Sequence, residues 1–247
     1  MNIEIDKKTL AAKLNEKYSD YSSAQILNAA INDDFKGKIA LLSSFGSHSA
    51  VQIRQIAEIN PALPVLFIDT LEHFDETLQY AQDLKNKYSL SSLRYVQPDA
   101  EKLKRIDPNG DLWKHQPNRN EWLRKVEPLQ NLLETGEFEA IITGRKSYQT
   151  SDRQNMDIVE LAEDGIFRIN PLHNWKSEDI AAEFAKHDLP PHPLVAKGYK
   201  SIGSKHSTAP VAEGEDERAG RWAHTKDADG NQKQECGLWV STDKKVE

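Results

Sequence analysis

The strongest constraint on the fold is an alternation of short apolar runs with longer segments of helical spacing. Runs such as "KIALLSS" and "PVLFIDT" are apolar almost throughout, which is typical of strands covered on both faces. Strands are predicted over residues 38–44, 64–70, 93–98, 139–144 and 166–172, and helices over 22–32, 50–59, 75–88, 120–134 and 177–188. This alternation predicts an α/β fold, a single doubly wound, mostly parallel sheet with helices on both faces.

Local signals refine three of the helices. Ser22 and Ser177 stand where two helices begin, and a serine hydroxyl there accepts a hydrogen bond from an unpaired backbone N–H. Pro128 is expected to interrupt the helix over 120–134, because proline has no N–H to donate.

The chain changes character from residue 195 onward. This part is rich in Gly, Lys, Ser, Asp and Glu and has no sustained periodicity. We therefore predict an α/β domain with an N-terminal helical segment over residues 1–195, followed over 196–247 by a C-terminal tail that is mobile or ordered by a ligand.

Composition excludes several classes of partner. The net charge is −7, whereas broad nucleic-acid binding needs a basic face. No stretch approaches the apolar length of a membrane span, and the start "MNIEIDKKTLAAKL" lacks the apolar core of a secretory signal. A cytoplasmic protein that binds neither nucleic acid nor membrane is therefore expected.

Ligands of parallel sheets lie beyond the carboxyl ends of the strands, so the loops that follow strands are the candidate sites. The loop "SSFGSHS" (43–49) combines hydroxyls, a glycine and a helix N-terminus, which suits a phosphate or sulfate, although a serine-capped turn explains the same residues. Asp69, after the second strand, suits either a ribose or base edge or a helix cap.

Cations gather in two further segments, the loop after strand 139–144 and "GEDERAGRW". They are Arg145, Lys146, Arg153, Arg218 and Arg221, with Trp222 beside the last. Arginine forks fit phosphate and sulfate oxygens, and a solvated charged loop is the alternative.

Cys236 is the only cysteine, so neither an intrachain disulfide nor a thiolate framework for zinc or an iron–sulfur cluster is available. The histidines show no metal-ligand spacing, and no metal site is expected. Surrounding cations would lower the pKa of a thiol and offset the repulsion between its thiolate and an anionic substrate. Cys236 is thus a candidate nucleophile, against the alternative of a small buried apolar residue.

Together these residues resemble the phosphoadenylyl-sulfate and adenylyl-sulfate reductases of the adenine-nucleotide α-hydrolase (PP-loop) superfamily. The motifs run in order: "LLSSFGSHSAV", "FIDT", "RKVEPL", "ITGRK", "INPLHNW", "GYKSIG", "GEDERAGRW" and "ECGL". The resemblance implies that residues 43–49, among them Ser43, Ser44, Phe45, Gly46 and Ser49, hold the phosphosulfate. It assigns Lys125, Arg145, Arg153, Arg218 and Arg221 to basic positions and Cys236 to the nucleophile, and Asp69, Lys146 and Trp222 complete the expected substrate-binding set.

Departures from the family pattern carry information. Cluster-bearing members have cysteines where this chain has Asn120, Glu121, Ser204 and Ser207, so the resemblance points to the cluster-free subgroup. That subgroup generally prefers the 3′-phosphorylated substrate. Trp239 stands where a histidine is usual, and the first loop lacks the Gly and Asp of the ATP-splitting branch.

The resemblance therefore implies an oxidoreductase of assimilatory sulfate reduction and cysteine biosynthesis. It would reduce 3′-phosphoadenylyl sulfate to sulfite and adenosine 3′,5′-bisphosphate through a Cys236 S-sulfonate. No bound cofactor is expected, the electron donor would be thioredoxin or glutaredoxin, and the resemblance implies a homodimer or larger assembly. The alternatives are a cluster-free adenylyl-sulfate reductase, a PP-loop ATP-dependent adenylating enzyme, and a nucleotide-binding protein with a redox-sensing thiol.

Overall fold

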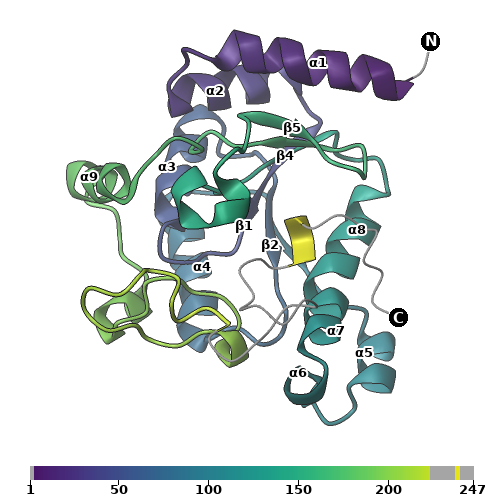
Figure 1. Cartoon of the computed structure of the whole chain (residues 1–247), viewed down its shortest axis with the longest axis vertical. Coiled ribbons are helices and arrows are strands. Elements are labelled where there is room, and N and C mark those ends of the chain that lie inside the picture. Colours follow the sequence, from purple (N-terminus) through teal and green to yellow (C-terminus); the bar gives the residue numbers. More distant parts are fainter. Residues whose placement is uncertain (1–2, 223–236, 240–247) are drawn as a thin grey trace.

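The computed structural model describes residues 3–222 and 237–239, and its centre is a six-stranded sheet in the order β3-β2-β1-β4-β6-β5 (Figure 1). The strands are β1 (Ile39–Ser43), β2 (Val65–Ile68), β3 (Leu93–Val96), β4 (Ala140–Ile142), β5 (Val159–Leu161) and β6 (Phe167–Ile169). Neighbouring strands are parallel except β5, which pairs antiparallel with β6. The predicted α/β class and mostly parallel sheet are confirmed. Strand β5 was not predicted.

Both faces of the sheet are covered, as the apolar runs predict. Ile39 and Leu41 of β1 belong to one buried cluster and Ala40 to another, because successive strand residues point to opposite faces. Helices on the two sides can be followed in Figure 1. The first cluster includes residues of α2 (Ser23–Ala29), α3 (Ser49–Ile59), α4 (Asp75–Lys87) and α9 (Ser177–His187); the second includes residues of α8 (Glu127–Leu133).

One of the two predicted serine caps is present. The Ser22 hydroxyl accepts the N–H of Gln25 at 3.4 Å, and the Gln25 amide oxygen accepts the N–H of Ser22 at 2.9 Å. The prediction for Ser177 is wrong. Helix α9 begins at Ser177, and the N–H of Lys176 donates to the Asp179 carboxylate at 2.8 Å, so an acid in the first turn takes the role expected of the serine.

The interruption expected at Pro128 is also absent. A π-helix, η2 (Trp122–Val126), joins α7 (Pro117–Glu121) to α8, and Pro128 lies in the first turn of α8. In this wider turn the N–H of Glu127 donates to the carbonyl of Trp122, five residues back. The π-turn shifts the bonding pattern just before the residue that has no N–H, so the helical run continues past the proline.

The N-terminal helix α1 (Ile3–Tyr18) lies along the edge of the sheet at β5 (Figure 1). The Asn15 side-chain amide donates to the Val159 carbonyl at 2.7 Å, and its oxygen accepts the Val159 N–H at 2.8 Å. A side chain thus satisfies the backbone groups that an edge strand leaves unpaired. None of the helices in the described ranges is both long and apolar enough to cross a membrane.

The segment after α9 folds over the carboxyl ends of the strands. It contains the short helices η5 (Pro193–Lys197) and η6 (Lys205–Ser207) and an antiparallel bridge between Thr208 and Arg221. Ile202, Ser204 and Trp222 are buried in it. Residues 196–222 of the predicted tail therefore form part of the packed structure, whereas residues 223–236 and 240–247 lie outside the described residues.

The Asn15 contact predicts a measurable contribution to stability. Asn15→Ala leaves both backbone groups of the buried Val159 without these partners and should lower the free energy of unfolding by about 1–3 kcal/mol. Asn28→Ala removes only an exposed side-chain bond to Asn32 and should change it by less than about 0.5 kcal/mol. Urea denaturation followed by circular dichroism compares the two, and equal losses would contradict the edge contact.

Candidate active site

The cavity that most of the predicted binding residues line, named the main cavity, has a volume of about 240 Å³ and lies where the strand order reverses between β1 and β4. Strand β1 has β2 on one side and β4 on the other, so the loops that follow β1 and β4 diverge and leave a crevice between them. Ser43, Ser44 and Gly46 line the cavity from the first loop, and Thr143 to Lys146 line it from the second. This is the position predicted from the strand-end loops.

The first loop brings polar groups and the N-terminus of α3 to the cavity. The Ser43 hydroxyl accepts the N–H of Phe45 at 3.1 Å, and the Ser47 hydroxyl donates to the carbonyl of Lys200 at 2.6 Å. A Cβ at Gly46 would lie 3.2 Å from the carbonyl oxygen of Ile202, so a glycine allows the two segments to approach closely. The loop is thereby held against the segment after α9.

Six cations line the cavity, and none of the described residues that line it is acidic. They are Lys125, Arg145, Lys146, Arg153, Arg218 and Arg221. At contact, one pair of opposite unit charges gains about 4 kcal/mol at the effective dielectric of a protein surface. In a chain of net charge −7, this lining makes the cavity a site for a multiply charged anion.

Burial lowers the pKa of three titratable groups that line the cavity, Lys146, His48 and His73. Burial lowers the pKa of Lys146 to about 8; Arg153 and Arg218 add to this lowering, and Glu217 opposes it. Burial, together with the charge of Lys146, lowers the pKa of His48 to about 3. His48 is therefore neutral at physiological pH, whereas Lys146 is only partly protonated near pH 8.

Arg221 owes its position to the loop that contains Gly203. Its Nη1 donates to the Thr208 hydroxyl at 2.6 Å, and Thr208 also accepts the N–H of Gly203 at 3.1 Å. A Cβ on residue 203 would lie 2.1 Å from Arg221 Nη1, which no real contact allows. The glycine therefore leaves the space that the guanidinium occupies.

Lys125 and Trp222 meet at a buried carboxylate. Glu121 Oε1 accepts from Lys125 Nζ at 3.2 Å and from Trp222 Nε1 at 2.8 Å. The Trp222 ring in turn lies 4.2 Å from the guanidinium carbon of Arg221. Arg145 pairs with Glu160 and donates to Asn170 at 3.1 Å.

The structure collects most of the predicted binding residues in this cavity. Those that line it are Ser43, Ser44, Gly46, Ser49, Lys125, Arg145, Lys146, Arg153, Arg218, Arg221 and Trp222. Phe45, within the loop, is fully buried, and its ring centroid lies 5.0 Å from that of Phe67. Asp69 accepts from the N–H of Leu71 at 3.0 Å and from Gln97 at 2.8 Å. Neither belongs to the lining, and their contact with substrate stays a prediction.

Cys236 lies outside the described residues. The helix η7 (Gly237–Trp239), which follows it directly in the sequence, lies beside η2. A Cβ at Gly237 would be 3.3 Å from a methyl group of Val126, and Leu238 lines the cavity. In Figure 1 this helix is the yellow element near α8 and β2.

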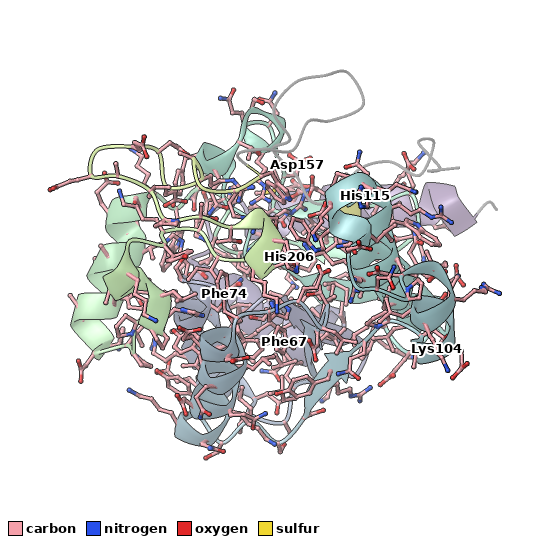
Figure 2. All side chains as sticks on the ribbon, turned by 90° about the horizontal axis from the view of Figure 1, so that it is seen from below. Phe67, Phe74, Lys104, His115, Asp157 and His206 are labelled. Carbon is pink, nitrogen blue, oxygen red and sulfur yellow. The ribbon has the colours of Figure 1, made fainter. Side chains whose placement is uncertain are left out.

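A second cavity, of about 320 Å³, shares Lys125, Ser204 and Trp222 with the first. Trp113 and His206 both line it, their rings are stacked with centroids 4.1 Å apart, and Figure 2 shows His206 near the middle of the view. The four positions at which the resemblance places cluster cysteines, Asn120, Glu121, Ser204 and Ser207, all line this cavity.

Those four side chains do not fit an iron–sulfur cluster, which needs thiolate ligands. Asn120 donates to the Glu72 carboxylate at 3.0 Å, and the Ser207 hydroxyl donates to the Ser204 carbonyl at 3.3 Å. Within the described residues, no group of three or more His, Cys, Asp or Glu side chains could hold a metal ion. The side chains at the four cysteine positions instead form hydrogen bonds with neighbouring residues.

Several lining residues escaped the sequence prediction. They include Gln52, Thr143, Gln149, Ile202, Gly203 and Leu238. Their residue types carry no distinctive chemistry, and of these six only Thr143 directly follows the end of a strand, where the strand-end rule could have indicated it. Gly203 lies within the quoted motif "GYKSIG", but its role depends on Arg221, which is distant in the sequence.

Gly203→Ala should weaken anion binding by displacing Arg221. The expected loss of affinity for adenosine 3′,5′-bisphosphate is about tenfold, equivalent to about 1.4 kcal/mol, measured by titration calorimetry. In an Arg221→Ala background the same substitution should have no further effect. An equal loss in both backgrounds would show that Gly203 acts otherwise.

The lowered pKa of Lys146 predicts a pH dependence of binding. A bound anion favours the charged ammonium, so binding takes up a proton once the pH exceeds about 8, and affinity should fall as the pH rises above that value. Titration of adenosine 3′,5′-bisphosphate between pH 7 and 9.5, with Cys236→Ser as the parent protein, measures this fall. Lys146→Met should bind more weakly and lack the fall; a persistent fall would assign the proton to another group.

Comparison with known proteins identifies the family of this chain. The family model of the phosphoadenosine phosphosulfate reductase domain matches residues 38–210. An adenosine 5′-phosphosulfate reductase of Mesorhizobium japonicum is 42% identical, with 94% of this chain and 87% of that protein covered. A phosphoadenosine phosphosulfate reductase of Saccharomyces cerevisiae is 36% identical, with coverages of 79% and 77%.

Among solved structures, the phosphate complex of phosphoadenylyl-sulfate (PAPS) reductase from Candida auris superposes with a TM-score of 0.68 at 27% identity. The match covers 81% of this chain and 96% of that one. The family model, the sequence relatives and the fold agree, and the chain belongs to the phosphoadenosine phosphosulfate reductase family.

Proposed function

We propose that this protein is a thioredoxin-dependent reductase that converts 3′-phosphoadenylyl sulfate to sulfite and adenosine 3′,5′-bisphosphate. The observation that carries the proposal is the cavity lining, six cations without an acid among the described lining residues. A phosphosulfate and a 3′-phosphate supply the matching negative charges. Leu42, Ile68 and Leu238 add an apolar part of the same lining, which suits the flat faces of an adenine.

In the first step, the Cys236 thiolate attacks the sulfur of the sulfonate. A bond forms between the cysteine sulfur and this sulfur, and the bond from the sulfonate to the phosphate oxygen breaks. Adenosine 3′,5′-bisphosphate leaves with the electron pair, and Cys236 carries an S-sulfonate. The cations of the cavity would stabilise the charge that develops on the leaving phosphate. Support comes from the position of η7, which brings the chain next to Cys236 in the sequence to the cavity wall.

In the second step, a thiolate of reduced thioredoxin or glutaredoxin attacks the Cys236 sulfur. Sulfite leaves with the electron pair, and a mixed disulfide joins the two proteins. The second thiol of the donor then attacks the donor's own sulfur in that disulfide, which regenerates the Cys236 thiolate and oxidises the donor. Two electrons pass from dithiol to sulfonate, so the balance requires no bound metal or flavin.

A second candidate is a reductase of adenosine 5′-phosphosulfate. The name of the Mesorhizobium japonicum relative favours it. The absence of cysteines at Asn120, Glu121, Ser204 and Ser207 favours the 3′-phosphorylated substrate, following the family pattern. An adenylating enzyme would instead release pyrophosphate from ATP, and a redox-sensing protein would form no sulfite.

Cys236→Ser should abolish sulfite formation and leave the affinity for adenosine 3′,5′-bisphosphate within about threefold, because the serine keeps the shape but loses the thiolate nucleophile. Sulfite is measured from each sulfonucleotide with equal reduced thioredoxin or glutaredoxin, and intact mass detects the sulfonate on the wild-type protein before the donor is added. Normal turnover by Cys236→Ser would refute the mechanism. Faster turnover of adenosine 5′-phosphosulfate would establish the second candidate.

A further inference from the structure

Glu121 occupies the wall between the two cavities, at the end of α7. It is buried, with 8% of its surface exposed, and it lines the second cavity and not the first. Its Oε1 atom accepts two hydrogen bonds, from Lys125 Nζ at 3.2 Å and from Trp222 Nε1 at 2.8 Å. Both donors line the cavity assigned to the substrate.

Through Trp222 the same carboxylate supports two arginines. The Trp222 ring lies 4.2 Å from the guanidinium carbon of Arg221 and 5.5 Å from that of Arg218. The backbone of Trp222 has a φ of 49°, in the left-handed region that costs a bulky residue energy. Contacts elsewhere must hold the residue in this conformation, and the indole bond to Glu121 is one of them.

The acceptor role differs from simple neutralisation of charge. An ammonium group has three N–H donors, so one bond to Glu121 leaves two for substrate oxygens. Glu121 is four residues before Lys125 on one helical run, which places both side chains on the same face. The bond therefore orients Lys125 toward the cavity without using up its donors.

The helical run that carries Glu121 is itself fixed by a buried network around Arg124. Arg124 donates to Asp107 at 2.6 Å, to the Thr70 carbonyl at 3.0 Å and to Asn120 at 3.0 Å. Asn120 also donates to Glu72. These bonds join the helical run to the loop after β2, so Glu121 projects from a rigid support.

We propose that Glu121 is a positioning residue of the substrate site, which holds Lys125 and Trp222, and through Trp222 the two arginines, by its hydrogen-bond acceptor. This inference rests on the proposed function, since it assumes that the cavity binds the sulfonucleotide. A positioning role requires the acceptor atom and not the negative charge. Glutamine keeps the acceptor, whereas leucine removes it.

Titration calorimetry with adenosine 3′,5′-bisphosphate tests this distinction. Glu121→Leu should raise the Kd at least tenfold, and Glu121→Gln should stay within threefold of the wild type. The matched control is Glu127→Gln, another buried acid of the same helical run, which pairs with Lys102 and does not line the main cavity. It should bind as the wild type does. Equal weakening in the leucine and glutamine variants, or in the control, would overturn the proposal.

The indole N–H resonance of Trp222, assigned by its absence from Trp222→Phe, gives a readout without ligand. It should move upfield in Glu121→Leu and change little in Glu121→Gln. If Glu121→Leu does not fold, Trp222→Phe removes the same bond from the donor side and should raise the Kd at least threefold; an unchanged Kd would overturn the proposal. If the wild type binds the nucleotide and forms sulfite, and Glu121→Leu binds and reacts equally well, only this inference is refuted. If the wild type neither binds the nucleotide nor forms sulfite, the proposed function is refuted together with this inference.

Discussion

The parallel pairing of β1 with both β2 and β4 is the constraint on which the site depends. Parallel neighbours end at the same edge of the sheet, so the loops that follow these strands lie at that edge. Because the strand order reverses at β1, the loops after β1 and β4 diverge and leave a crevice between them. Most of the groups that line the cavity from the first 170 residues lie in the last residues of β1 and β2 or in the segments that follow β1, β2 and β4. The hydrophobic faces thereby determine where the charges gather.

Gathering six cations opposes folding, because like charges repel and each loses water. The acids that offset this cost interact with the cations but do not line the cavity. Glu160 pairs with Arg145, Glu121 pairs with Lys125, and Glu217 acts on Lys146. This arrangement leaves the inner surface positive while three acids outside the lining offset part of the repulsion, which prepares the cavity for an anionic ligand in advance of binding.

Most of the sheet could be predicted, because strands buried on both faces have unbroken apolar runs. Strand β5 could not, since three residues at a half-exposed edge carry no such pattern. The strand-end rule found Arg145 and Lys146 but included Phe45, whose left-handed φ of 49° accompanies a ring buried in the core. The role of Gly203 could not be predicted, because it depends on the contact with Arg221, which is distant in the sequence. The structure does not describe Cys236, so the nucleophile rests on the sequence.

The amide of Asn15 has a consequence for self-association. An open border of a β-sheet is a template on which another chain can add a strand, and proteins that stay apart must block it. On the β5 side, α1 and the Asn15 side chain already occupy the backbone groups of Val159. The β5 border is therefore blocked at Val159 against strand pairing with another copy of the chain, and the opposite border of the sheet is β3.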